Sequence, residues 1–226
     1  MEISAKNIVL NGFNVIYLKT NSTRGGDIMD DFEKIIEMAK QNNSIVRTKM
    51  VVEAGIRKER LKELLNKGSL VKISRGIYAI NNDALDEYFE FQQKCPVGIY
   101  SYGTALYFWD LSNRVPNVIS YTVPQGFNTS RIKAGSKVHY HYVKQEVLNV
   151  GAVRIKSPQG AEIMVYDRER TICDIVKDRK KMDMQIYTDA LNGYFKGKQK
   201  NIRKLIKYGK LFGIEEEIMK YMEVLQ

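Results

Sequence analysis

Cationic side chains gather in a stretch near the N-terminus, where their types and spacing suit binding to phosphate groups. Arg57 and Lys58 begin a predicted helix, and Arg75 stands at the top of a predicted hairpin. Lysine and arginine neutralise phosphates, and the arginine fork also pairs with the edge of a guanine. This stretch is therefore predicted to bind double-stranded DNA. The candidate DNA-binding residues are Arg47, Thr48, Lys49, Arg57, Lys58, Arg60, Lys62, Ser74 and Arg75.

The elements that position these residues can be inferred from the hydrophobic pattern. Residues 30–40, 44–54 and 56–67 are predicted helices, with Gly55 as a tight turn and Gly68 as a helix stop, and residues 69–80 form a hairpin. Three helices followed by a hairpin are typical of a winged helix-turn-helix, whose third helix reads base edges with its N-terminal part. The alternative is a solvated helix whose cations only keep it soluble, which Glu59 and Glu63 would suit.

The amino-acid composition excludes several kinds of protein. The chain has 226 residues, 44% of them hydrophobic and 27% charged, which excludes a disordered tail, a collagen-like fibre and a coiled coil. Its net charge of +10 favours an anionic partner. No apolar stretch approaches the ~18 residues of a membrane span, and the N-terminus does not resemble a secretory signal. Cys95 and Cys173 are expected to be free and buried, so we expect a cytoplasmic protein without membrane contacts.

Residues 1–28 differ in character from the rest of the chain. They are mixed in polarity and end in the loop-like run Arg24-Gly25-Gly26-Asp27. A G-rich coding sequence for that run would resemble a bacterial ribosome-binding site ahead of the Met29 codon. We therefore favour Met29 as the native start, with residues 1–28 as upstream sequence read in frame. The alternative is a genuine flexible arm.

Beyond residue 82 the pattern becomes mixed. A helix over residues 85–93 is followed by a second one that Ser101 can cap, by short strands, and by a helical C-terminal half. We predict an α+β protein in which a winged helix-turn-helix domain (29–82) precedes a larger mixed α+β domain (83–226). The predicted strands cover 118–123, 138–143, 153–156 and 162–166, and the C-terminal helices begin with 168–177 and end with 214–225.

Several segments, taken in order, resemble the AbiEi-type antitoxins, which are the regulators of type IV toxin–antitoxin modules in abortive infection. The resemblance covers residues 29–226, although many members have histidine where Tyr102 stands. It lies in the predicted wing 68–78, the serine-led helix 101–106, the strand 119–124 that ends in proline, and the segment 168–174 with Arg170, Thr171 and Asp174.

The resemblance implies a bifunctional protein for phage defence. Its winged helix would bind inverted repeats in its own promoter and repress the operon. Its second domain would counter a nucleotidyltransferase-like toxin without forming a stable complex. No catalytic residue, cofactor or metal is implied.

Three other features allow competing interpretations. The carboxylates of Asp167, Glu169, Asp174 and Asp178 suit a DNA-tethered nuclease or phosphoryl or nucleotidyl transferase, but interleaved cations favour ion pairing, and Arg170 and Asp174 are expected to form a helix-surface pair. His139 and His141 share a strand face, where a half-buried polar face is favoured over a metal site.

The third feature is the stretch Lys177–Lys210, which holds eleven Lys and Arg residues against three Asp residues. Its default interpretation is a solvated helical face. The alternative is a second nucleic-acid contact that uses the interleaved aromatic residues Tyr187, Tyr194, Phe195 and Tyr208.

Overall fold

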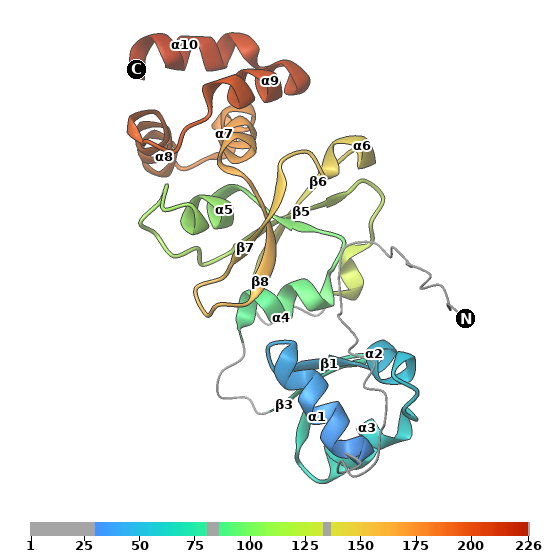
Figure 1. Ribbon diagram of the computed structural model, residues 1–226. Coiled ribbons are helices and arrows are strands. Elements are labelled where there is room, and N and C mark those ends of the chain that lie inside the picture. The colour runs from blue at the N-terminus through green and yellow to red at the C-terminus, as the bar shows by residue number, and fades with distance from the viewer. Residues whose placement is uncertain (1–29, 81–85, 133–136, 226) are drawn as a thin grey trace, which may run out of the picture.

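The computed structural model describes residues 30–80, 86–132 and 137–225, so the predictions made for residues 1–28 lie outside the described residues. The described chain is a mixed α+β protein with two sheets, as predicted. Figure 1 places the sheet nearer the N-terminus below helix α4 and the larger sheet above it, with the C-terminal helices at the far end. We call the two sheets the N-terminal sheet and the C-terminal sheet.

The N-terminal region contains three helices and three strands in the order α1-β1-α2-α3-β2-β3. The strand order is β1-β3-β2, and both pairings are antiparallel. The core on the helix side of this sheet includes Ile35, Val46, Val51, Leu61 and Leu70. The elements are α1 (Asp31–Gln41), β1 (Ile45–Arg47), α2 (Thr48–Glu53), α3 (Glu59–Asn66), β2 (Leu70–Ser74) and β3 (Ile77–Ile80).

The predicted helix over 44–54 is wrong in its first residues. Ile45–Arg47 form strand β1, with Ile45 opposite Ala79 and Arg47 opposite Ile77 of strand β3. The β-branched Ile45 and Val46 are both fully buried, on opposite faces of the sheet. Successive side chains of a strand point to opposite faces of the sheet, so two consecutive residues can both be buried when both faces are covered. A short amphipathic helix buries only one face.

Helix α3 begins later than predicted, at Glu59 instead of residue 56. Ile56 is buried in the helical core, while Arg57 and Lys58 lie in the connection before the first helical residue. The predicted turn at Gly55 and stop at Gly68 are confirmed, with φ angles of +77° and +72°. Arg57 and Lys58 therefore lie ahead of α3 and not within its first turn.

The larger, C-terminal part is built on a five-stranded mixed sheet of order β6-β5-β4-β8-β7. Pairs β4–β5 and β7–β8 are antiparallel, and pairs β4–β8 and β5–β6 are parallel. Its elements are α4 (Glu87–Lys94), β4 (Ile99–Tyr100), α5 (Tyr102–Phe108), β5 (Ile119–Pro124), η1 (Thr129–Arg131), β6 (Val138–Val143), α6 (Gln145–Leu148), β7 (Ala152–Lys156), β8 (Glu162–Tyr166), α7 (Arg168–Lys177), η2 (Arg179–Lys181), α8 (Met184–Lys196), α9 (Ile202–Phe212) and α10 (Glu215–Leu225).

The two parts of the molecule share a core. On the face of the N-terminal sheet that points away from α1 and α3, Ile45, Ile77 and Ala79 belong to one buried cluster with Tyr88 and Phe91 of α4. The N-terminal sheet is therefore covered on both faces, by its own helices on one side and by the C-terminal part on the other. Figure 1 shows α4 between the two sheets.

Helix α7 lies in the interior, which corrects the expectation of a helix-surface pair. The Arg170 and Asp174 side chains are only 2% and 8% exposed, and Arg170 Nε donates to Asp174 Oδ1 at 2.9 Å. Helices α5, α8, α9 and α10 cover α7, because its sequence offers apolar residues around Ile172 and Ile175. A charged i,i+4 pair is thus buried with the helix.

Two further expectations concern burial and membranes. Cys95 and Cys173 are free and buried, as predicted. Among the helices of the described ranges, none is long and apolar enough to cross a membrane.

Candidate nucleic-acid interface

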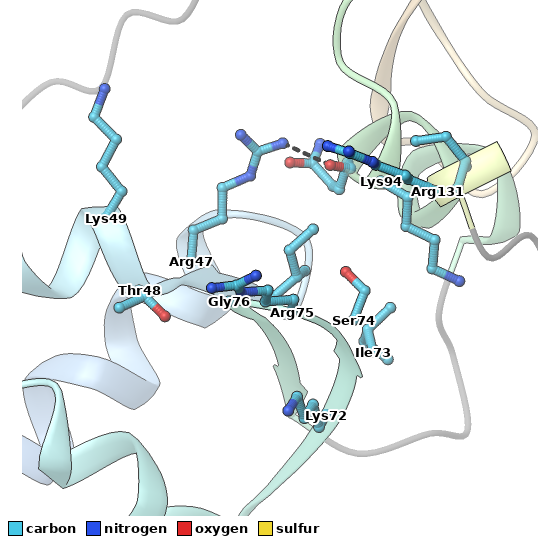
Figure 2. Close-up of a pocket in the computed structure, with 13 residues that line it drawn as sticks. Arg47, Thr48, Lys49, Lys72, Ile73, Ser74, Arg75, Gly76, Lys94 and Arg131 are labelled. Atoms are coloured by element: carbon cyan, nitrogen blue, oxygen red, sulfur yellow. Dashed lines mark hydrogen bonds between the residues drawn. The ribbon is translucent and has the colours of Figure 1, made fainter. Parts of the chain in front are cut away.

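A basic groove of about 790 Å³ lies where the β2–β3 hairpin meets the end of α4 and the turn η1 (Figure 2). Among the lining residues that the structure describes, six are Lys or Arg and none is Asp or Glu. The lining residues are Arg47, Thr48, Lys49, Lys72, Ile73, Ser74, Arg75, Gly76, Ile77, Gln93, Lys94, Arg131 and Ile132. The groove unites five of the nine predicted DNA-binding residues, which come from the start of α2 and from the hairpin.

The hairpin turn presents Arg75 to solvent at the mouth of this groove. Arg75 and Gly76 connect β2 to β3, and Gly76 has a φ of +75°, which glycine adopts without the strain that a side chain adds. The Thr48 amide donates to the Gly76 carbonyl at 2.9 Å, so the start of α2 is tied to the turn. This bond fixes Arg75 relative to Thr48 and Lys49.

Arg47 lies deeper, at the wall that the C-terminal part provides. Its Nη2 donates to the Gln93 carbonyl of α4 at 3.1 Å, as the dashed line in Figure 2 marks. Burial lowers the pKa of Arg47, but a guanidinium stays protonated at neutral pH. Four of its five N–H groups are not used in that bond, so Arg47 can hold both α4 and an anion.

The predicted recognition helix divides its cations between two faces. Arg57, Lys58 and Lys62 are exposed, and Lys58 and Lys62 lie one turn apart. Arg60, two residues before Lys62, points to another side of α3, because two helical residues turn the direction by about 200°.

Arg60, which is also a predicted DNA-binding residue, is engaged within the protein. Its Nη1 donates to Glu63 Oε2 at 2.9 Å, its Nε lies 3.7 Å from Asp31 Oδ2, and its guanidinium sits over the Phe32 ring. The hydrogen bond to Glu63 raises the pKa of Arg60. Arg60 therefore fastens α3 to α1 and positions the helix.

Three cations of the groove were not predicted. Lys72 is exposed on β2, Lys94 ends α4 and pairs with Glu90, and Arg131 ends the turn η1. Alternation along the hairpin places Lys72 on a polar face, so its exposure could have been found from the sequence. Lys94 and Arg131 reach the groove only because the C-terminal part packs on the N-terminal sheet, and no local pattern signals that.

The carboxylates along α7 are all engaged by neighbouring groups, and Lys204 lies near two of them, Asp167 and Glu169. Asp167 caps the helix and lies 2.9 Å from Lys204 Nζ, and Glu169 accepts hydrogen bonds from the Tyr194 hydroxyl and the Asn201 amide. Asp174 is paired with Arg170. Asp178 accepts from the Tyr102 hydroxyl at 2.6 Å and from Lys181.

This arrangement suits structural ion pairing more than phosphoryl transfer. Within the described part of the chain, no group of three or more His, Cys, Asp or Glu residues is arranged to hold a metal ion. His141 stacks on the Tyr102 ring at 3.7 Å, and burial together with His139 lowers its pKa to about 4. A half-buried strand face, the favoured interpretation of these two histidines, agrees with this packing.

In the helical region Lys177–Lys210, the aromatic residues are buried and many of the cations are exposed. Tyr187, Tyr194, Phe195 and Tyr208 are all buried in the core of the C-terminal helices, so none can stack on a base. Its exposed cations remain on the surface, among them Arg203 and Lys207 of α9. This surface fits the default interpretation of a solvated helical face.

Ser101 precedes α5 as predicted. Its hydroxyl accepts a hydrogen bond from the Thr122 hydroxyl instead of capping the helix.

Comparison with known proteins supports these observations. The crystal structure of the RV2827C protein from Mycobacterium tuberculosis is similar, with a TM-score of 0.54 and 12% sequence identity over 86% of this chain and 82% of that chain, which shows a shared fold. No curated protein matches the chain. A family model described as an AbiEi antitoxin transcriptional regulator matches residues 33–81. The predicted resemblance to the AbiEi antitoxin family of transcriptional regulators is thereby confirmed over residues 33–81.

Proposed function

We propose that this protein is a DNA-binding transcriptional repressor whose residues 29–82 act as a winged helix-turn-helix. The order α1-β1-α2-α3-β2-β3 supports this, with α3 in the role of recognition helix and the β2–β3 hairpin in that of the wing. The observation that carries the proposal is the exposure of four cations: Arg57 and Lys58 just ahead of α3, Lys62 on α3, and Arg75 in the hairpin turn. Cations on a wing and ahead of a recognition helix lie where such domains meet phosphates and base edges.

We further propose that it represses its own operon at inverted repeats in the promoter and acts as the antitoxin of a type IV module. The family match at residues 33–81 supports this assignment. In this proposal residues 83–226 antagonise a nucleotidyltransferase-like toxin without forming a stable complex. The pairing of buried Asp174 with Arg170 and of buried Asp167 with Lys204 favours a non-enzymatic role over the DNA-tethered enzyme.

The proposal is tested with one charge-reversed variant of the full chain, in which Arg57, Lys58 and Arg75 are all replaced by Glu. All three side chains are exposed, so we expect the protein to fold normally. Repression of a promoter reporter should be lost, because carboxylates would then face phosphates. Protection against the toxin, with both genes expressed from foreign promoters, should persist.

A matched variant controls for the change of charge itself. Lys177, Lys180 and Lys196, exposed cations of the C-terminal helices, are replaced by Glu in the same way. This control should still repress. If the variant with Arg57, Lys58 and Arg75 replaced by Glu folds and still represses, DNA binding by this surface is overturned. One that folds but no longer protects would show that repression and antitoxicity are a single activity.

A further inference from the structure

We infer that the groove between the hairpin and the turn η1 holds a phosphodiester strand of the bound DNA, and that Arg131 of the C-terminal part contacts it directly. This inference rests on the proposed function and extends the DNA-binding surface beyond residues 29–82. It names a contact residue that lies far along the chain from the predicted helix-turn-helix.

The first observation is the charge of the groove. The guanidinium groups of Arg47, Arg75 and Arg131 and the ammonium group of Lys72 surround it, and no described lining residue carries a carboxylate. Figure 2 shows these side chains around a common space, with Arg131 reaching from the side opposite the hairpin. Like charges gathered in this way repel one another unless an anion enters, and a cleft lined by one sign of charge attracts its counter-ion.

The second observation is that the turn that carries Arg131 is anchored to the fold. Phe127 and Ile132, on either side of the turn, pack against the core cluster shared by the two parts of the molecule. The Asn128 side chain accepts from the Ser130 amide at 3.0 Å, and Thr129 and Tyr142 share a hydrogen bond of 2.9 Å between their hydroxyls. Because the backbone of the turn is already placed, only the Arg131 side chain has to be ordered by a ligand, which reduces the entropy lost on binding.

The third observation is the bond between Arg47 and Gln93. It joins the wall formed by α4 to the strand that precedes α2, so the two sides of the groove keep their separation. An open groove whose charged lining residues, among those described, are all basic suits a strand of sugars and phosphates, whose charges are evenly spaced. Arginine binds phosphate through two parallel N–H bonds, which suits Arg75 and Arg131 on facing walls.

The inference is tested by measuring the salt dependence of binding to a duplex from the region upstream of the gene and to a scrambled duplex. Arg131→Ala should lower the slope of log K against log[salt] by about 0.9, the loss of one phosphate contact. Its affinity should fall several-fold on both duplexes alike, because a phosphate contact carries no sequence information. Arg131→Lys keeps the charge and should keep the wild-type slope.

Lys156→Ala is the matched control, since it removes an exposed cation of β7 that does not line the groove. Its slope should equal that of the wild type. If Arg75→Ala lowers the slope and Arg131→Ala does not, the inference fails while the proposed function stands. If the wild type does not bind the upstream duplex, both fail. A loss for Arg131→Ala on the upstream duplex only would also overturn the phosphate contact.

Discussion

The basic groove and the surroundings of α7 both concentrate charged side chains, but they use them in opposite ways. In the groove, no described lining residue carries a carboxylate, although Lys49 and Lys94 each pair with a glutamate outside the lining, Glu53 and Glu90. Around α7, each carboxylate meets a cation, a hydroxyl or a backbone amide, and Arg170 and Asp174 are buried together. Unneutralised charge that faces solvent is available to a ligand, whereas buried and paired charge holds the structure together. The first region is therefore the one that we propose binds DNA, and the second is expected to contribute to stability.

The largest expected effect belongs to the buried region. Replacing Arg170 by Met leaves Asp174 without its ion pair and removes the donor to the Val147 and Val150 carbonyls. Breaking a buried pair by removing one partner costs about 3–5 kcal/mol, so the free energy of unfolding in urea should fall by that amount.

The exposed Arg203 on α9 supplies the control for this prediction, because Arg203→Met should change the free energy of unfolding by less than about 0.5 kcal/mol. Adding Asp174→Leu to Arg170→Met should recover part of the loss, since no unpaired charge then stays buried. Equal stability of Arg170→Met and the wild type would contradict the structural role of the pair.

A smaller effect separates two arginines of the predicted recognition helix. Arg57→Ala should reduce the discrimination between the upstream duplex and a scrambled one by about 1–3 kcal/mol, because an arginine contact to a base edge is lost. Arg60→Ala should leave that discrimination intact and lower stability instead, since Arg60 is bonded to Glu63 and lies near Asp31. Competition binding and urea unfolding of both variants measure this. The reverse outcome would exchange the roles of the two residues.

A third effect tests whether the C-terminal part responds to acid. Burial lowers the pKa of His141 to about 4, below the ordinary ~6.5 of the unfolded chain. The stability that neutral His141 provides is complete above pH 6.5. It is lost progressively as the pH falls from 6.5 through 4, because over that range the unfolded state takes up the proton more readily than the folded state. His141→Gln should therefore lose about 1–2 kcal/mol less than the wild type between pH 7 and 4.5, allowing for partial solvation of the ring. Identical pH profiles in urea unfolding would count against this.

Much of the fold is predictable from local patterns, and the difference between the regions shows where such prediction ends. The helix over Asp31–Gln41 and the hairpin around Arg75 can be inferred from periodicity and from turn chemistry. Strand β1 cannot, because three residues carry too short a pattern and pair with β3, far along the chain. The burial of α7 depends on four other helices, so its Arg170–Asp174 pair could be anticipated but its location could not.

The candidate site divides in the same way. Five of its predicted residues line the groove and three others are exposed at or before α3. Arg60 differs, because the face of α3 that packs on α1 depends on where Phe32 lies. Arg131 had no signal in the sequence, since its place in the groove depends on the packing of Phe127 and Ile132 against the shared core. Because the two parts of the molecule share that core, a fragment would expose part of it, so each variant is tested in the full chain.

The central claim, that the exposed cations of the N-terminal region bind DNA through its phosphates, is tested most directly by the salt dependence of wild-type binding to the upstream duplex. If about five phosphates are engaged, log K should fall against log[salt] with a slope of roughly −4 to −5. The variant with Arg57, Lys58 and Arg75 changed to Glu should lose this binding. An affinity that does not change with salt, or that the triple variant retains, would contradict the account.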